Sequence, residues 1–272
     1  MVVIRFTGHL AIFFMNNQFL CEGSVTEATE MSNYIDVEEY DQHEEKHAYY
    51  VDMMAEMSRI LSKHRGDDAK PCRVLELGAG TGIFTKRLAK IPNIQVVAVE
   101  IDVQCFQILE HNIQNYPSVE LVNGDSCTYH HQEAKFDYIV SSFADHHIKT
   151  EDKHRYLQNV RRNLQPDGLF IVGDEFLRLH DSNNHDDWEA ALQDYHNHII
   201  AIALEQGEDI LANLERDALK SGLEQNGDFK ISCSQYEQFL IQTGFAFERK
   251  KIGPLNRDDI GGVYVYWSRL PK

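Results

Sequence analysis

The sequence has few positive charges, no basic run and no long apolar segment. Lys and Arg number 26 against 43 Asp and Glu, which gives a formal net charge of −17. A surface this acidic repels phosphate backbones, so nucleic acid is not an expected partner. The apolar run over 10–15 is too short to span a membrane. These absences favour a protein that acts on a small-molecule acceptor, with neither nucleic acid nor a membrane as its partner.

Cysteine is also scarce and shows no metal-binding pattern. The five cysteines include no C-x-x-C pair, so we expect free thiols in a reducing compartment, the cytoplasm, and no zinc site. Arg5 before the apolar run faintly resembles the start of a signal peptide, and a mistaken start ahead of Met15 or Met31 explains the run equally well. Residues 1–30 are therefore treated as peripheral to function. The oligomeric state stays open.

The order of apolar runs and helical patterns predicts an α/β fold with one doubly wound, mostly parallel sheet. Continuous apolar strands separated by helices are typical of a sheet that is buried on both faces. The seven expected strands are 72–77, 94–100, 119–122, 136–141, 169–173, 245–252 and 262–268. The expected helices among them are 84–90, 103–115, 153–164 and 235–243.

Two helical segments fall outside this alternation. Apolar residues at helical spacing over 36–64 predict a helical region before the first strand. A stripe that begins at Trp188 predicts a long amphipathic helix after the fifth strand, with a second helix over 210–223. We expect an N-terminal extension and helical region over 1–66 and a main domain over 67–272. Its insertion, 175–227, is expected to form a lid over the carboxyl edge of the sheet, where ligands bind.

A glycine cluster follows the first expected strand in the order Glu76-Leu-Gly-Ala-Gly-Thr-Gly. Closely spaced glycines between a strand and a helix let the backbone turn tightly and approach a ligand. The dinucleotide fingerprint G-x-G-x-x-G would need glycine at 83, where the chain has Ile83. The cluster therefore differs from the pyrophosphate-binding type, which disfavours a dinucleotide oxidoreductase.

Acidic residues end the second and third strands. Glu100 is placed to accept hydrogen bonds from the ribose hydroxyls of an adenosine ligand, and its charge disfavours a 2′-phosphate. Asp125, which ends the third strand with Asn123-Gly124 before it and Ser126 after it, can offer an oxygen to the adenine amino group.

Together these three elements resemble the class I S-adenosylmethionine-dependent methyltransferases, which have a Rossmann-like fold. The resemblance covers 72–173 firmly and 234–268 in outline, and it implies S-adenosylmethionine as cofactor. It also implies that Glu76 and the glycine backbone hold the methionine part, that Glu100 holds the ribose, and that Ile101 packs on adenine. Tyr40 or Tyr49 is a candidate to face the sulfonium with its ring, although core packing explains these tyrosines equally well. The expected cofactor-binding residues are Glu76, Gly78, Ala79, Gly80, Gly82, Glu100, Ile101, Asp125, Ser126, Ser142 and Tyr40.

The loop after the fourth strand and the end of the fifth carry the candidate catalytic residues. His146 or His147 can take a proton from the acceptor, because histidine titrates near neutral pH. Glu175, or Asp174 beside it, can orient the acceptor or act as base. Each of these residues can instead have a purely structural role, by packing against its neighbours or by capping a helix. A metal site built from Asp145 and both histidines, completed by Asp174, Glu175, His180 or His185, is a further alternative that we do not favour.

The predicted activity is transfer of a methyl group to a small molecule by in-line displacement, with the acceptor atom (O, N or C) left open. Several alternatives remain. One is a protein of this fold that binds the cofactor without methylating, since fold does not dictate function. Another is a methyltransferase acting on protein or tRNA, of which the tRNA version is disfavoured by the charge.

Overall fold

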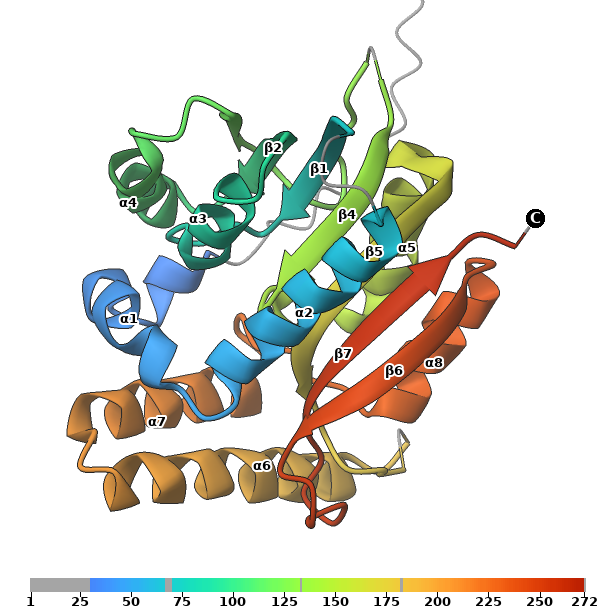
Figure 1. Ribbon diagram of the computed structural model, residues 1–272. Helices are drawn as coiled ribbons and strands as arrows, with labels where there is room; N and C mark the ends of the chain where they lie inside the picture. The colour runs from blue at the N-terminus through green and yellow to red at the C-terminus, as the bar shows by residue number, and fades with distance from the viewer. Residues whose placement is uncertain (1–29, 67–69, 133, 182, 272) are drawn as a thin grey trace, which may run out of the picture.

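The computed structural model describes residues 30–66, 70–132, 134–181 and 183–271, and Figure 1 shows the arrangement. Seven strands form one sheet in the order β3-β2-β1-β4-β5-β7-β6, in which β1 to β5 are parallel and β7 runs antiparallel to its neighbours β5 and β6. Their bounds are β1 Cys72–Leu77, β2 Ile94–Glu100, β3 Val119–Asn123, β4 Phe136–Ser142, β5 Leu164–Phe176, β6 Ala246–Gly253 and β7 Gly262–Arg269. This confirms the predicted doubly wound, seven-stranded sheet.

Helices cover both faces of the sheet. Successive strand residues point to opposite sides, so these continuous apolar strands have an apolar face on each side that helices bury. Val74 of β1 belongs to a core shared with one set of helices, and the next residue, Leu75, to the core on the other face. The first set is α2 Tyr50–Arg65, α3 Ile83–Ala89 and α4 Val103–Ile113. The second set is α5 Lys153–Asn163 and α8 Cys233–Gln242. The crossovers diverge between β1 and β4, so a ligand site is expected at their carboxyl ends.

Strand β5 is longer than the predicted 169–173. It begins at Leu164, where it pairs with Phe136, and the register shifts before pairing with β4 resumes at Leu169. Antiparallel pairing with β7 carries the strand on to Phe176. Sequence pattern missed this extension because Asp174 and Glu175 are charged, although both are buried. These two carboxylates therefore project from a fixed strand.

The predicted helical region over 36–64 is broken. It forms α1 Val37–His43, a short 3-10 turn η2 Glu44–Lys46, and α2. The break ends at Tyr49, which has the left-handed φ of 70°. The chain thereby turns, and residues 44–47 lie over the carboxyl edge while α2 packs on the sheet. The apolar run over 10–15 lies outside the described residues.

Two antiparallel helices, α6 His185–Glu205 and α7 Asp209–Leu223, lie below the carboxyl ends of the parallel strands in Figure 1. Buried side chains of α6 pack with Leu177 just after β5 and with Ala48 and Tyr49 before α2. The helix pair therefore contacts both the sheet and the N-terminal segment.

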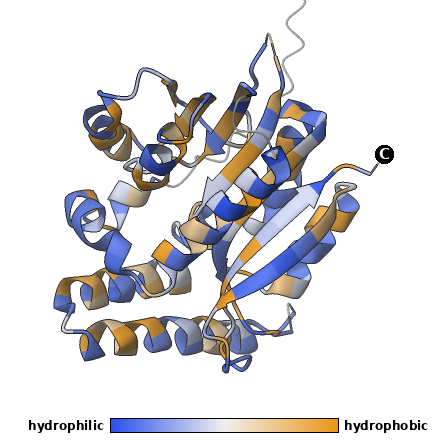
Figure 2. Ribbon diagram, viewed as in Figure 1, coloured by the Kyte–Doolittle hydropathy of each residue, from blue (hydrophilic) through white to orange (hydrophobic). Residues whose placement is uncertain are grey.

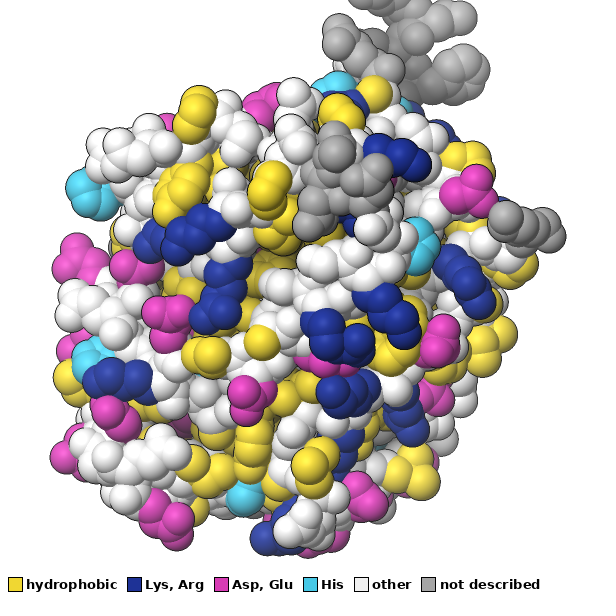
Figure 3. Space-filling view, viewed as in Figure 1, with side chains coloured by type: hydrophobic (Ala, Val, Ile, Leu, Met, Phe, Trp, Pro, Cys, Tyr) yellow, Lys and Arg dark blue, Asp and Glu magenta, His cyan; other side chains and the backbone are white. Residues whose placement is uncertain are grey.

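The outermost strand, β6, is hydrophilic along most of its length in Figure 2, and Lys and Arg side chains gather over β6, β7 and α2 in Figure 3. Lys250 and Lys251 of β6 each pair with a carboxylate, Glu56 of α2 and Asp258. Lysines on an edge strand discourage pairing with another sheet. None of the described helices has the length and apolar character needed to cross a membrane.

The boundary expected at residue 66 stays a prediction, although α2 shares its core with the strands. Met53 and Met57 are fully buried, and a Cβ built on Gly173 of β5 would lie 2.5 Å from the Met57 Sδ.

We expect Met57→Ala to lower the free energy of unfolding by about 2–5 kcal/mol, because it leaves a cavity against β5. Urea denaturation measures this, with the exposed Lys63→Ala on the same helix as control. Equal effects of the two changes would contradict the packing of α2 on the sheet.

Candidate active site

A pocket opens at the carboxyl ends of four adjacent parallel strands and encloses about 1130 Å³, open solvent at its mouth included. Segments after β1, β2, β3 and β4 line it, and the N-terminal segment forms the remaining wall. The predicted residues on its lining are Tyr40, Glu76, Gly78, Ala79, Gly80, Glu100, Ile101, Asp125, Ser126, Ser142 and His147. Ten of the eleven residues predicted to bind the cofactor therefore line a single pocket.

Glycine is required where the turn after β1 approaches β4. Gly78 has a φ of +72°, and a Cβ there would lie 2.4 Å from the Ala144 Cβ. Gly82 is the exception among the predicted cofactor-binding residues, because it does not line the pocket. A Cβ on Gly82 would lie 2.6 Å from Leu109 Cδ1, so this glycine lets α4 approach the start of α3.

The carboxylate of Glu100 ties the glycine turn to the end of β2. Its Oε2 accepts from the Gly80 N–H at 2.7 Å, and its Oε1 accepts from the Asp102 N–H at 2.8 Å. Burial raises the pKa of Glu100 to about 7, against the effect of these two donors. Asp102 in turn accepts from the Ser32 N–H at 2.6 Å, which fastens η1 Met31–Asn33 over this corner.

Glu76 lies deeper in the same pocket, with 1% of its surface exposed. The Thr85 hydroxyl donates to its Oε2 at 2.6 Å, and burial raises the pKa of Glu76 to about 8. The hydroxyl of Thr81 is buried on the lining without a hydrogen-bond partner among the described residues. A carboxyl short of counter-charge and an unused hydroxyl fit a ligand with ammonium and carboxylate groups.

A second pocket adjoins the first and shares the lining residues Met31, Tyr40, Phe143 and His147 with it. The apolar part of its lining comes mainly from α7 and consists of Ile35, Leu211, Leu214 and Ala218. Most of the remaining lining residues are acids and bases, and one of them, Glu215, also belongs to α7. The two pockets therefore meet at these four shared residues.

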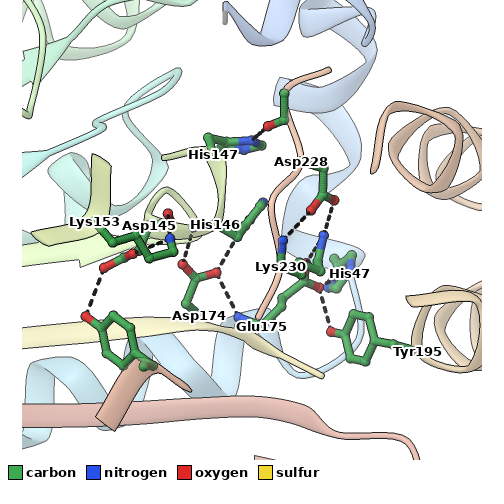
Figure 4. A network of polar contacts seen from close by, with 12 residues as sticks. His47, Asp145, His146, His147, Lys153, Asp174, Glu175, Tyr195, Asp228 and Lys230 are labelled. Carbon is green, nitrogen blue, oxygen red and sulfur yellow. Dashed lines mark hydrogen bonds and ion pairs between the residues drawn. The ribbon is translucent and has the colours of Figure 1, made fainter. Parts of the chain in front are cut away.

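His146 lines the second pocket as part of a pair with Asp174, drawn in Figure 4. Its Nδ1 lies 2.5 Å from Asp174 Oδ1, and its backbone N–H donates to Oδ2 at 2.9 Å. Burial opposes ionisation of Asp174, but His146 outweighs it and holds the pKa of Asp174 below its usual value. The pairing leaves Nε2 of His146 unbonded among the described residues, as a base requires.

His147, the other predicted histidine, is fixed as a neutral ring. Its Nδ1 lies 2.7 Å from the Gly227 carbonyl and 2.9 Å from the Tyr34 hydroxyl. Burial lowers the pKa of His147 to about 3, so the ring donates from Nδ1 without charge. We expect it to shape the passage between the two pockets.

Three acids and three bases form a closed ring of contacts, and five of the six line the second pocket. Glu175 of β5 contacts Lys230, and the contacts continue through α6 and α7 and back to β5, partly drawn in Figure 4. In order, the members are Glu175, Lys230, Asp228, His196, Glu215 and His47. All six are buried, so each charge depends on its neighbours in the ring.

The distances within the ring are those of hydrogen bonds and ion pairs. Glu215 of α7 contacts His47 Nε2 through one oxygen and His196 Nδ1 through the other, each at 2.9 Å. Lys230 Nζ lies 3.0 Å from Glu175 Oε2 and also donates to Asp228. The ring is closed by His47 Nε2 at 3.4 Å from Glu175 Oε1. It therefore joins α6, α7, the 228–230 segment and the N-terminal segment to β5.

Glu175, a predicted catalytic residue, is held on both oxygens. The Tyr195 hydroxyl donates to Oε1 at 2.6 Å, and Lys230 occupies Oε2. This arrangement favours a positioning role for Glu175 over that of a base. The sequence does not predict the other ring members, because their positions from 47 to 230 show no motif.

The metal site considered as an alternative has no support here: no group of three or more His, Cys, Asp or Glu suited to a metal occurs within the described ranges.

Known proteins share this domain. A family described as a methyltransferase domain matches residues 74–168. An uncharacterized methyltransferase of Oceanobacillus iheyensis is 25% identical over 202 residues, covering 72% of this chain and 85% of that protein. A malonyl-acyl-carrier-protein O-methyltransferase of Halalkalibacterium halodurans is 26% identical over 166 residues, covering 55% of this chain and 60% of that protein.

A solved phosphoethanolamine N-methyltransferase of Haemonchus contortus, in complex with S-adenosylmethionine, has a TM-score of 0.57 at 15% identity. The match covers 80% of this chain and 53% of that one, so the chain spans about half the length of that protein. This likeness shows a shared fold.

The buried charges predict how stability depends on pH. Burial opposes protonation of His47, but Glu215 outweighs it and raises the pKa of His47 from 6.5 to about 10. The His47–Glu215 pair therefore contributes its full stabilisation of the folded state below about pH 6.5, and this contribution is lost as the pH rises through about 10. Glu44 and Glu76, raised from 4.5 to about 8, act in the same direction, because only the folded state keeps their protons. We expect the free energy of unfolding from urea titrations to fall from about pH 6 to about pH 10. A constant or rising value contradicts this account.

Proposed function

Because this chain is a class I S-adenosylmethionine-dependent methyltransferase, we propose that it methylates a hydroxyl group of a small molecule bound in the second pocket. The observation that carries the proposal is the His146–Asp174 pair, whose unbonded Nε2 belongs to a residue lining that pocket. A hydroxyl acceptor needs a base, whereas an amine can lose its proton before it binds. The pair therefore favours oxygen as the acceptor atom.

The first pocket is proposed to hold the cofactor. Glu76 and the turn over 78–81 would bind the methionine part, with the Thr81 hydroxyl as an added donor. Glu100 would accept from the ribose hydroxyls, since each of its oxygens keeps a second lone pair. Adenine would lie between Ile101 and the segment 125–126. When bound, the cofactor supplies a methyl group already activated by the positive sulfur.

Tyr40, Phe143 and His147 line both pockets, so they would surround the path along which the methyl group passes. Ser142 is proposed to contact the cofactor beside them. In-line alignment of acceptor and donor, with water excluded, supplies much of the rate enhancement in such a reaction. The insertion 175–227 would act as the lid that excludes water, attached to the main domain through the charged ring.

The proton of the acceptor hydroxyl is proposed to move to His146 Nε2 as the methyl group arrives. Asp174 holds the imidazole through Nδ1 and would stabilise its positive charge. General-base catalysis of this kind contributes about 10²–10⁴-fold to the rate. Glu175 would not accept the proton itself. Its contact with Lys230 would instead hold the Lys230 side chain in place on the lining of the second pocket.

A cytoplasmic location is proposed from the described cysteines, Cys72, Cys105, Cys127 and Cys233, all of which are free thiols. The net charge of −17 remains the argument against a nucleic-acid partner.

A screen of hydroxyl-bearing metabolites for release of S-adenosylhomocysteine tests the proposed activity. If the cofactor binds but no acceptor gives turnover, the alternative of a cofactor-binding protein without methyl transfer is favoured.

Glu100 provides the prediction for the cofactor site. Glu100→Ala should weaken S-adenosylmethionine binding about 10- to 100-fold, which corresponds to the loss of charged hydrogen bonds to ribose. Calorimetry measures the affinity, and Glu120→Ala, an exposed change on the neighbouring strand β3, is the control. Unchanged affinity in Glu100→Ala would show that the ribose does not lie there.

His146 provides the prediction for the chemical step. With any acceptor found by the screen, His146→Ala should lower kcat by about 10²–10⁴-fold while S-adenosylhomocysteine affinity stays the same. The exposed His111→Ala on α4 is the control and should change neither value. Wild-type turnover in His146→Ala would exclude this residue as the base and remove the argument for oxygen.

A further inference from the structure

Glu44 is a buried acid in the second pocket whose carboxyl pairs with no described residue. It is the first residue of η2 and has 4% of its surface exposed. Its side chain lines the pocket but makes no hydrogen bond or ion pair within the described parts of the chain. A buried carboxyl normally has such partners, because the loss of hydration is otherwise uncompensated.

The cations of this pocket are already engaged. Lys230 contacts Glu175 and Asp228, and His47 contacts Glu215. An anionic acceptor would therefore find no free positive group on the described lining. An acceptor with a positive group would find Glu44.

We propose that the acceptor carries an ammonium group, bound by Glu44, in addition to the hydroxyl that faces His146. This inference rests on the proposed function and names the class of its substrate: an amino alcohol or aminoalkyl phenol. The apolar part of the pocket lining, formed by Ile35 and by α7, would contact its carbon skeleton. Tyr40 and Phe143, also on the lining, offer aromatic faces that attract a cation.

Electrostatics agrees with this geometry. Burial raises the pKa of Glu44 to about 8, and the adjacent His47 only partly offsets it. The charged groups that face Glu44 are His47, Glu175, Glu215 and Lys230. Binding of an ammonium group would favour the ionised carboxylate, so the complex should release a proton near pH 7.

The experiment uses the full chain loaded with S-adenosylhomocysteine and three phenols of similar size. Tyramine carries the ammonium group, para-ethylphenol is neutral, and para-hydroxyphenylacetate is anionic. Calorimetry should show tyramine binding about 10- to 100-fold more tightly than para-ethylphenol, with the anion weakest, as expected for a charged hydrogen bond. Titrations in two buffers of different ionisation enthalpy should show proton release on tyramine binding only.

Glu44→Gln should remove both the preference for tyramine and the proton release. Its affinity for S-adenosylhomocysteine should not change, because Glu44 does not line the first pocket. The variant should also unfold at a higher urea concentration than the wild type above about pH 8, since it lacks a buried carboxyl that must ionise there. Glu45→Gln is the matched control: Glu45 is the exposed neighbour that pairs with Arg87.

The outcomes separate this inference from the function on which it rests. If S-adenosylhomocysteine does not bind, the proposed function fails. If it binds but tyramine binds no better than para-ethylphenol, or not at all at millimolar concentration, the ammonium proposal is overturned. A preference for tyramine that survives in Glu44→Gln also overturns it.

Discussion

The closed ring of buried acids and bases at the second pocket joins three parts of the chain that are far apart in sequence. Glu175 is fixed in β5, Glu215 lies on α7, and His47 precedes α2. Burying ions costs several kcal/mol each, and that cost is recovered only when every ion has its partners. Displacement of α6 or α7 would leave buried charges unpaired. The ring therefore restricts these two helices and the N-terminal segment to one arrangement, from which the second pocket takes its shape.

The carboxyls whose pKa burial raises most clearly line the two pockets but are not members of the ring. Burial raises the pKa of Glu76, Glu100 and Glu44, whereas their counterpart Glu215, between two histidines, has a lowered pKa. Groups that destabilise the free protein are typical of binding sites, where stability is exchanged for function. Each of the three has a cation or a hydroxyl donor as its natural complement. The uncompensated acids thus mark the positions at which ligand groups are expected.

The residues that the sequence predicts to bind the cofactor converge on one pocket, because the signals that mark them are local. The glycine turn, Glu100 and Asp125 each follow a strand, and parallel strands bring their carboxyl ends to one edge whatever the details of packing. The acceptor side was predicted only in part. His146 was found because it lies in the loop after β4, whereas Lys230 and Glu44 meet there only through the break at Tyr49 and the return of the chain after α7. No spacing rule connects residues whose proximity depends on tertiary packing.

This difference has a consequence for specificity. Most residues of the first pocket come from strand ends that the sheet positions. The second pocket is lined by segments that side-chain contacts join, so one substitution at position 44 would alter its charge without touching β1, β2 or the glycine turn. Acceptor choice can then diverge among proteins that keep the same cofactor site. Charge at the acceptor pocket, and not the glycine motif, is the feature from which the substrate of this chain is to be inferred.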